Sequence, residues 1–259
     1  ILIMNKLNQN ENYLKKKVFF TETKWPHFNL LFNDIKKLSK LIKTDSCVVS
    51  LERNNLYGGA SLFAPFFSNH KFISVDCVSP ALKKRGKYNS KNILGNKKII
   101  HHKRNYQFDY RKIKLKSNYA DLIIIPNLMH HINDVNILLN QAKRILKKKG
   151  RIYIFEPMVR ELHQIPEDYY RITPYGFKFL LKKRKFKNFK IKFEGGPFTA
   201  IIYCWDQSLQ YLPKNLVTKK LKWLNKNTKY LRHLDKKYRK NLHRKKTSFP
   251  MSYSLLANL

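Results

Sequence analysis

Cysteine is scarce in this chain, and the cysteines present form no recognisable pattern. Cys47, Cys77 and Cys204 are an odd number, and none has a partner at the spacing of a metal site. A disulfide framework is therefore disfavoured, and we expect a reducing cytoplasm rather than secretion. Ile1 to Ile3 are followed at once by a polar run, which does not fit a signal peptide.

The sequence also lacks long hydrophobic runs, internal repeats and an evident linker. The apolar stretch Thr199 to Leu212 is too short and too interrupted to span a bilayer. The 259 residues are enough for one α/β domain with a substantial core. We expect a helical segment over 1–44, a core over 45–193, a basic helical excursion or lid over 194–248, and a last strand within 249–259.

Acidic residues are few, because 16 Asp and Glu stand against 54 Lys and Arg, for a formal net charge of +38. Such a charge suggests nucleic-acid binding, since phosphate neutralisation supplies most non-specific affinity. The lysines are spread among Asn, Ile, Phe and Tyr, which adenine- and thymine-rich codons favour, so compositional drift explains much of the charge. Compositional drift explains less well the concentration of basic residues in the helix predicted within Lys214 to Lys246. We interpret it first as a solvated face, then as a contact with anionic lipid at the inner membrane surface, and last as a nucleic-acid contact.

The sequence in the middle of the chain predicts strands and a helix that follow one another with short connections. Leu122 to Ile125 is a β-branched apolar run, typical of a parallel strand buried on both faces. Asn133 or Asp134 can cap the helix that follows, and Gly150 is predicted to end it in a left-handed conformation. Ile152 to Phe155 is predicted as the next buried strand.

Two strands are predicted upstream, and a carboxylate follows each. Glu52 comes after Cys47 to Leu51, and Asp76 comes after Phe72 to Val75. The carboxyl ends of parallel strands share one edge of a sheet, where ligands bind. A carboxylate after the second strand can accept hydrogen bonds from both ribose hydroxyls of an adenosine.

Three stretches carry a resemblance to a known family: Ala120 to Ile125, His130-His131-Ile132, and Arg144 to Pro157. They resemble the later half of class I S-adenosylmethionine-dependent methyltransferases. His163 to Phe177 looks like the loop after the fifth strand in a branch whose members act on small molecules, lipids and glycans. Over residues 45–193, the resemblance implies a Rossmann-like, doubly wound α/β sheet of seven strands. That sheet is mostly parallel with an antiparallel last strand, and it carries helices on both faces.

Glycine is missing where this family needs it. In the family, the turn after the first strand is glycine-rich, because a Cβ would collide with the methionine part of the cofactor. Here Glu52 to Tyr57 occupy that turn, and Gly58 and Gly59 come late. Asn54 tolerates a left-handed backbone and can replace a glycine. Alternatively, the loop has lost its cofactor.

The resemblance implies S-adenosyl-L-methionine as the cofactor, held by Glu52, Asn54, Gly58, Gly59, Asp76, Asp109 and Asn127. Asp76 lies at about the expected 20 residues beyond the turn, and the family resemblance also gives it the ribose role. The resemblance places Asp109 near the adenine amino group, although an aspartate at a strand end is also a common turn residue.

His130, His131 and Glu156 are the candidate catalytic residues. A histidine can act as general base near neutral pH, and Glu156 follows a strand toward the same edge as a base or substrate anchor. The two histidines can equally be ordinary loop residues. No metal is expected, because neither this pair nor His101-His102 is flanked by ligand residues at zinc spacing.

The loop from His163 to Arg171 is predicted to bind substrate through His163, Asp168, Tyr170 and Arg171, because loops over this edge commonly carry binding groups. Alternatively, Asp168 and Arg171 form only a local ion pair before a helix that Thr173 caps. The sequence thus predicts methyl transfer to an oxygen or nitrogen of a small-molecule, lipid or glycan acceptor. The alternatives are a catalytically inactive binding protein with this fold, and an RNA-binding or RNA-modifying protein that uses the basic helix.

Overall fold

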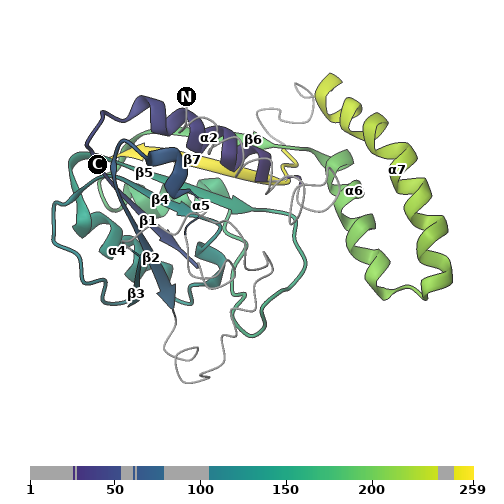
Figure 1. Ribbon diagram of the computed structural model, residues 1–259, viewed down its shortest axis with the longest axis horizontal. Coiled ribbons are helices and arrows are strands. Elements are labelled where there is room, and N and C mark those ends of the chain that lie inside the picture. The colour runs from purple at the N-terminus through teal and green to yellow at the C-terminus, as the bar shows by residue number, and fades with distance from the viewer. Residues whose placement is uncertain (1–25, 27, 54–60, 62, 79–104, 239–247) are drawn as a thin grey trace.

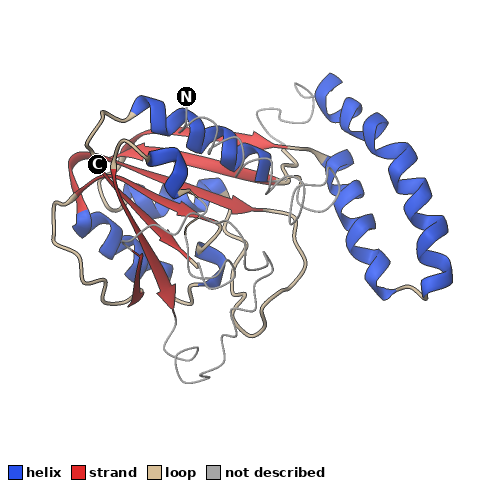
Figure 2. Cartoon of the chain, viewed as in Figure 1, coloured by secondary structure: helices blue, strands red, loops and turns tan. Residues whose placement is uncertain are grey.

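A seven-stranded sheet forms the centre of the molecule (Figure 1, Figure 2). The computed structural model describes residues 26, 28–53, 61, 63–78, 105–238 and 248–259. The strands are β1 (Cys47–Glu52), β2 (Lys71–Val78), β3 (Asn105–Asp109), β4 (Ala120–Pro126), β5 (Leu146–Pro157), β6 (Lys187–Glu194) and β7 (Ser252–Asn258). Their order is β3-β2-β1-β4-β5-β7-β6, in which β1 to β5 are parallel and β7 is antiparallel to β5 and β6. The predicted Rossmann-like, doubly wound α/β sheet is confirmed.

Two of the helices, α4 and α5, begin at capping residues that the sequence predicted. They are α2 (Phe28–Leu41), α4 (Val135–Ile145), α5 (Pro174–Lys182), α6 (Pro197–Ser208) and α7 (Lys214–Lys237), with short 3-10 turns η2 (Ala64–Phe67), η3 (Met129–His131) and η4 (Leu209–Tyr211). Asp134 caps α4 by accepting the N–H groups of Asn136 and Ile137, at 3.0 and 3.3 Å. Thr173 caps α5 by accepting the N–H of Gly176 at 3.1 Å.

Two hydrophobic cores sandwich the sheet, because successive side chains of each strand point to opposite faces. On one face Val49 and its neighbours pack with α4 and α5, and on the other Val48 and its neighbours pack with α2 and η2. A buried polar contact fixes α2 on its face, since Asp34 accepts a hydrogen bond from Ser254 Oγ of β7 at 2.6 Å. Helices therefore cover both faces, as predicted.

The end of α4 differs from the prediction. The helix stops at Ile145 and the chain enters β5 at Leu146, so Gly150 lies within a strand. The left-handed residue there is Lys149, with φ of 70°. Glycine is needed at position 150 because the backbone passes close to neighbouring atoms there. A Cβ at this position would lie 2.7 Å from the Leu146 side chain and 2.9 Å from the Lys147 carbonyl oxygen.

Helices α6 and α7 form a hairpin, here called the arm, that projects from one end of the sheet (Figure 1). In the sequence the arm lies between β6 and β7. Ile202, Leu209 and Leu224 form the small core that joins its helices. None of the helices in the described part of the chain combines the length and the apolar content that a membrane crossing requires.

Candidate active site

The carboxyl ends of β1, β2, β4 and β5 meet at one edge of the sheet, and most predicted site residues follow them. Strand order reverses between β1 and β4, because β2 lies on one side of β1 and β4 on the other. Ligands of doubly wound sheets bind in the crevice at such a switch point. Asn54, Gly58 and Gly59, which were predicted to bind the cofactor, lie outside the described residues.

Two buried carboxylates stand side by side at this edge. Glu52 is the last residue of β1, and its register partner Asp76 lies two residues before the end of β2, which continues to Val78 beyond the predicted end at Val75. The two residues are 3% and 9% exposed. Ser61 Oγ donates a hydrogen bond of 2.5 Å to Glu52 Oε1. Burial raises the pKa of Glu52 to about 7, and the charge of Asp76 acts in the same direction. Glu52 therefore titrates near neutral pH.

Asp109 also lies at this edge, as the last residue of β3. Its carboxylate accepts hydrogen bonds from the Arg111 side chain at 2.9 and 3.2 Å and from the Arg111 N–H at 2.9 Å. These contacts within the turn agree with the alternative interpretation of Asp109 as a turn residue. Its contact with adenine stays a prediction.

Asn127 follows β4 directly and adopts a left-handed backbone, with φ of 57°. Its N–H donates to the Phe155 carbonyl oxygen at 2.8 Å. Its buried Oδ1 has no hydrogen-bond partner among the described residues. An unsatisfied buried acceptor costs about 1–3 kcal/mol, and a ligand that donates a hydrogen bond would remove that cost.

Glu156 holds the turn after β4. Its Oε1 accepts the N–H groups of Leu128 and Met129 at 2.9 and 2.7 Å, and its Oε2 lies 2.5 Å from His130 Nδ1. Burial raises the pKa of Glu156 to about 8, although the backbone donors lower it. Both carboxylate oxygens are thus engaged within the protein, which makes Glu156 an anchor of the histidine turn.

His130 and His131 meet His163 from the loop after β5. The ring centroid of His163 lies 5.1 Å from that of His130 and 4.9 Å from that of His131. Burial lowers the pKa of all three, for His163 to about 4, so they are neutral at physiological pH. Imidazoles with such low pKa values are weak bases in the free protein.

The loop after β5 is tied down by ion pairs. Arg171 donates to both oxygens of Asp168, at 2.5 and 2.8 Å, so the predicted alternative of a local ion pair is present. Arg171 and other donors hold the pKa of Asp168 below its usual range, although burial acts to raise it. Tyr170 is exposed and donates through its hydroxyl to the Asn133 carbonyl oxygen at 2.8 Å.

Sequence reasoning missed a buried ion pair that joins two walls of the crevice. Arg53 Nη2 donates to Glu167 Oε2 at 2.9 Å, and the two side chains are only 6% and 5% exposed. Arg53 follows β1, whereas Glu167 belongs to the loop after β5. No local pattern signals a pair whose members are 114 residues apart.

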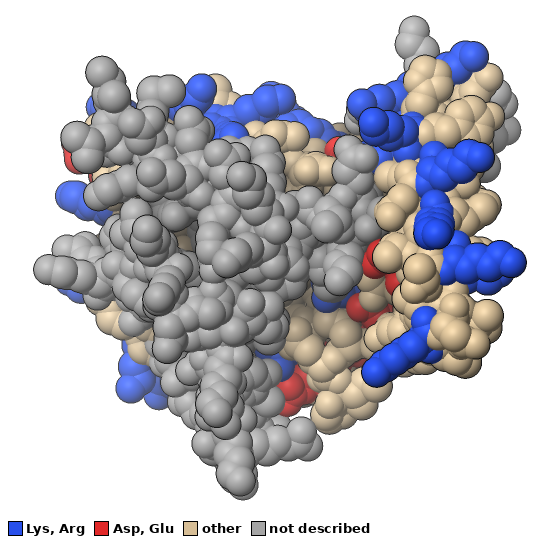
Figure 3. Space-filling model, turned by 45° about the vertical axis from the view of Figure 1, so that its right-hand side comes forward, with Lys and Arg blue, Asp and Glu red and all other residues tan. Residues whose placement is uncertain are grey.

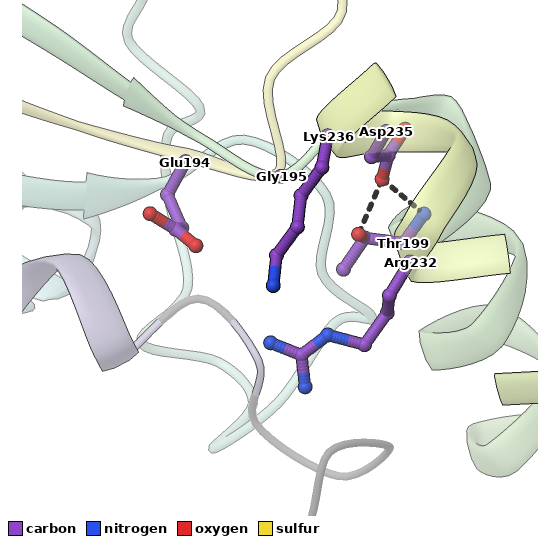
Figure 4. A pocket seen from close by; sticks show the side chains of 6 residues that line it. All are labelled: Glu194, Gly195, Thr199, Arg232, Asp235 and Lys236. Atoms are coloured by element: carbon purple, nitrogen blue, oxygen red, sulfur yellow. Dashed lines mark hydrogen bonds between the residues drawn. The ribbon is translucent and has the colours of Figure 1, made fainter. Parts of the chain in front are cut away.

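A second hollow lies where the arm joins the sheet and contains no predicted site residue. It is lined by Glu194, Gly195, Thr199, Arg232, Asp235 and Lys236. The carboxylate of Asp235 accepts the N–H and the hydroxyl of Thr199, so α7 caps the start of α6 (Figure 4). Figure 4 shows the cationic ends of Arg232 and Lys236 reaching into the hollow on the side of Glu194.

The comparisons with known proteins agree with this geometry. Residues 58–154 match the family model described as "Methyltransferase domain". A SAM dependent methyltransferase from Archaeoglobus fulgidus aligns with 16% identity and a TM-score of 0.51, over 89% of this chain and 94% of that one. A putative sarcosine dimethylglycine methyltransferase from Galdieria sulphuraria aligns with 13% identity and a TM-score of 0.51, over 89% and 84%.

A third structure, a putative methyltransferase from an antibiotic biosynthesis pathway of Anabaena variabilis, aligns with 14% identity and a TM-score of 0.50, over 88% of this chain and 97% of that one. At such low identities these structures show the fold. No curated protein sequence matches the chain. The predicted resemblance to class I methyltransferases is confirmed.

Proposed function

We propose, from the match of residues 58–154 to a methyltransferase domain, that this protein is an S-adenosylmethionine-dependent methyltransferase acting on an oxygen or nitrogen of a small-molecule, lipid or glycan acceptor. The observation that most supports the proposal is the pair of buried carboxylates, Glu52 and Asp76, at the switch point of the sheet. When bound, S-adenosylmethionine supplies an electrophilic methyl group on a sulfonium centre.

The residues at the edge fit this cofactor. We assign to Asp76 the acceptance of hydrogen bonds from both ribose hydroxyls, the role that a carboxylate after the second strand performs in such sheets. Asn127 offers a buried oxygen that lacks a donor among the described residues. Glu52 borders the turn that would receive the methionine part.

The chain contributes to catalysis mainly by orientation. Burial lowers the pKa of His131 far below its ordinary value, so this side chain is a weak proton acceptor. Holding an acceptor atom in line with a reactive methyl group can alone supply several kcal/mol of the barrier reduction. We therefore assign the loop with His163, Asp168, Tyr170 and Arg171 to positioning the acceptor, whose own lone pair attacks.

Calorimetric titration of the purified protein with S-adenosylmethionine and S-adenosylhomocysteine tests the proposal. We expect binding of one equivalent with a dissociation constant in the micromolar range. Extract fractions enriched in small molecules, lipids or glycans would then be assayed with methyl-labelled cofactor. Tight binding without transfer to any fraction would count against catalysis, and the absence of binding would favour the inactive-fold alternative.

The surface of α7 supports a further proposal about partners. Figure 3 shows Lys and Arg side chains along this side of the arm. Lys219, Lys222, Lys226 and Lys229 recur at helical spacing and are exposed, and Trp223 beside them is 43% exposed. Basic side chains with an interleaved exposed aromatic fit an anionic lipid surface. We propose that α7 contacts such a surface.

Replacing these four lysines by glutamine is expected to weaken binding to vesicles that contain about one third phosphatidylserine by more than tenfold, since each basic residue near such a surface contributes about 1 kcal/mol. Vesicle co-sedimentation measures the effect. A variant with Lys147, Lys148 and Lys149 replaced by glutamine is the control. Equal loss in the control would contradict the proposal, and salt-sensitive RNA binding without vesicle binding would favour the nucleic-acid alternative.

A further inference from the structure

Three histidines from two loops converge beside the crevice. His130 and His131 belong to η3 after β4, and His163 belongs to the loop after β5. One ring nitrogen from each lies within 4.8 Å of the others, and Nε2 of His130 and Nε2 of His163 are 3.3 Å apart. Each of the three rings therefore brings one nitrogen into the same small region.

The opposite nitrogen of each ring is already engaged by an oxygen. His131 Nδ1 lies 2.5 Å from the Glu167 carbonyl oxygen, and His163 Nδ1 lies 3.2 Å from the Glu161 carbonyl oxygen. A carbonyl oxygen can only accept, so both rings carry their proton on Nδ1 and present Nε2 as a lone pair. Histidine ligands of metals show this arrangement, in which an outer oxygen fixes the tautomer.

His130 follows the same pattern through a carboxylate. Its Nδ1 lies 2.5 Å from Glu156 Oε2, while Glu156 Oε1 accepts two backbone N–H groups. A carboxylate that orients a histidine in this way raises its basicity as a ligand. With the proton on Nδ1, the Nε2 lone pairs of His130 and His163 would repel each other across 3.3 Å unless a cation lay between them.

The spacing suits a small transition-metal ion. Zinc–imidazole bonds of about 2.0–2.1 Å at a tetrahedral angle put two ligand nitrogens roughly 3.3 Å apart. That is the separation between His130 and His163. The ligand nitrogens of the three residues lie within 4.8 Å of one another, so the His131 nitrogen would have to move closer to complete the set. Nitrogen-only ligands favour zinc and its neighbours over magnesium and calcium, which prefer oxygen.

Carboxylates offset part of the positive charge around the cluster. Arg160, Arg171 and Arg53 act on His130 and disfavour a positive charge there. Glu167 pairs with Arg53 and Asp168 pairs with Arg171, so each of these two guanidinium groups has a carboxylate beside it. The positive charge that a metal ion would meet is therefore smaller than the three arginines alone would produce.

We propose that His130, His131 and His163 bind one divalent transition-metal ion, zinc in the first instance, through their Nε2 atoms. Three protein ligands leave a fourth coordination position for water or for an acceptor oxygen, as in catalytic zinc sites. No metal was expected because the histidines lack zinc spacing along the chain. That criterion cannot detect the contact of His163 with His130 and His131, which are distant in the sequence. The proposal does not rest on methyl transfer.

Metal titration of the chelator-stripped full-length chain tests this proposal. We expect one equivalent of Zn²⁺ to bind in calorimetry, and His163→Gln to weaken its binding at least 100-fold. His163 is chosen because its side chain is 11% exposed, whereas His130 is more deeply buried. His233→Gln, on the exposed surface of α7, is the matched control and should bind as the wild type does. Unchanged binding in His163→Gln would overturn the proposal.

A wild-type measurement keeps the test decisive if that variant fails to fold. Co²⁺ in a tetrahedral nitrogen site absorbs strongly in the visible range, and without cysteine ligands it shows no thiolate charge-transfer band in the near ultraviolet. We expect the first signal without the second. An octahedral spectrum, a thiolate band or no binding would contradict the site. The last result would favour a metal-free network in which Glu156 keeps a proton and His130 donates to His163.

Discussion

Asp76→Ala is expected to weaken S-adenosylmethionine binding by about 100-fold. The proposed contacts of Asp76 are two charge-assisted hydrogen bonds from the ribose hydroxyls, and losing them removes about 3 kcal/mol. Asp76 lies near the carboxyl end of β2, with only Cys77 and Val78 after it, so the substitution removes the carboxylate and leaves the apolar side chains of the strand unchanged. Calorimetry with S-adenosylmethionine and S-adenosylhomocysteine measures the change.

The control for this experiment is Asp206→Ala, which removes a carboxylate from α6 in the arm. Its cofactor affinity should match that of the wild type. If Asp76→Ala bound as tightly as the wild type, the ribose assignment would be wrong even though the fold is that of a methyltransferase. Weakening in both variants would indicate a general electrostatic effect of the highly basic chain.

Glu167→Ala is expected to lower the free energy of unfolding by about 3–5 kcal/mol, because it removes a carboxylate that compensates the charge of the buried Arg53 guanidinium. The two side chains are 6% and 5% exposed, so this pair is well shielded from water. Urea denaturation followed by circular dichroism gives the difference. Glu167 also joins the loop after β5 to the end of β1, so the variant should bind the cofactor more weakly as well.

The matched control is Lys147→Ala, which breaks the ion pair with Asp121 at the opposite edge of the sheet. Those side chains are 46% and 32% exposed, and exposed pairs contribute only about 0–1 kcal/mol. Equal destabilisation by the two substitutions would show that burial does not decide the strength of these pairs. If Glu167→Ala lowered the free energy of unfolding by less than about 1 kcal/mol, the expected effect of burial on this ion pair would be contradicted.

Local chemistry was sufficient to predict the strands and helix starts. The apolar runs Leu122 to Ile125 and Ile152 to Phe155 lie within β4 and β5. Asp134, one of two alternatives for the cap of α4, and Thr173, the predicted cap of α5, both accept backbone N–H groups at the helix starts. These features depend on neighbours within a few residues. Gly150 was misread for the opposite reason, because its role depends on how closely the chain passes Leu146.

Contacts between distant segments could not be predicted from the sequence. The Arg53–Glu167 pair and the meeting of His163 with His130 and His131 depend on two loops leaving neighbouring strands toward the same edge. Composition gave no hint of either, because contacts between residues far apart in the sequence leave no trace in the amino-acid counts. Glu52 and Asp76 were expected to lie side by side because each follows an apolar strand run, and they are register partners of β1 and β2, while their role as cofactor ligands stays a prediction.

The connection between the arm and the sheet bears on how this protein could diversify. Glu194 and Ser252, which flank the arm, are register partners, and the Met251 N–H donates to the Glu194 carbonyl oxygen at 2.9 Å. The arm is thus an enlarged hairpin loop between adjacent strands, and Ser252 also pairs with Pro157 at the carboxyl edge. Exchanging this loop during evolution would leave every strand in register. The arm can therefore change in length and sequence independently of the strands that position Glu52, Asp76 and Glu156.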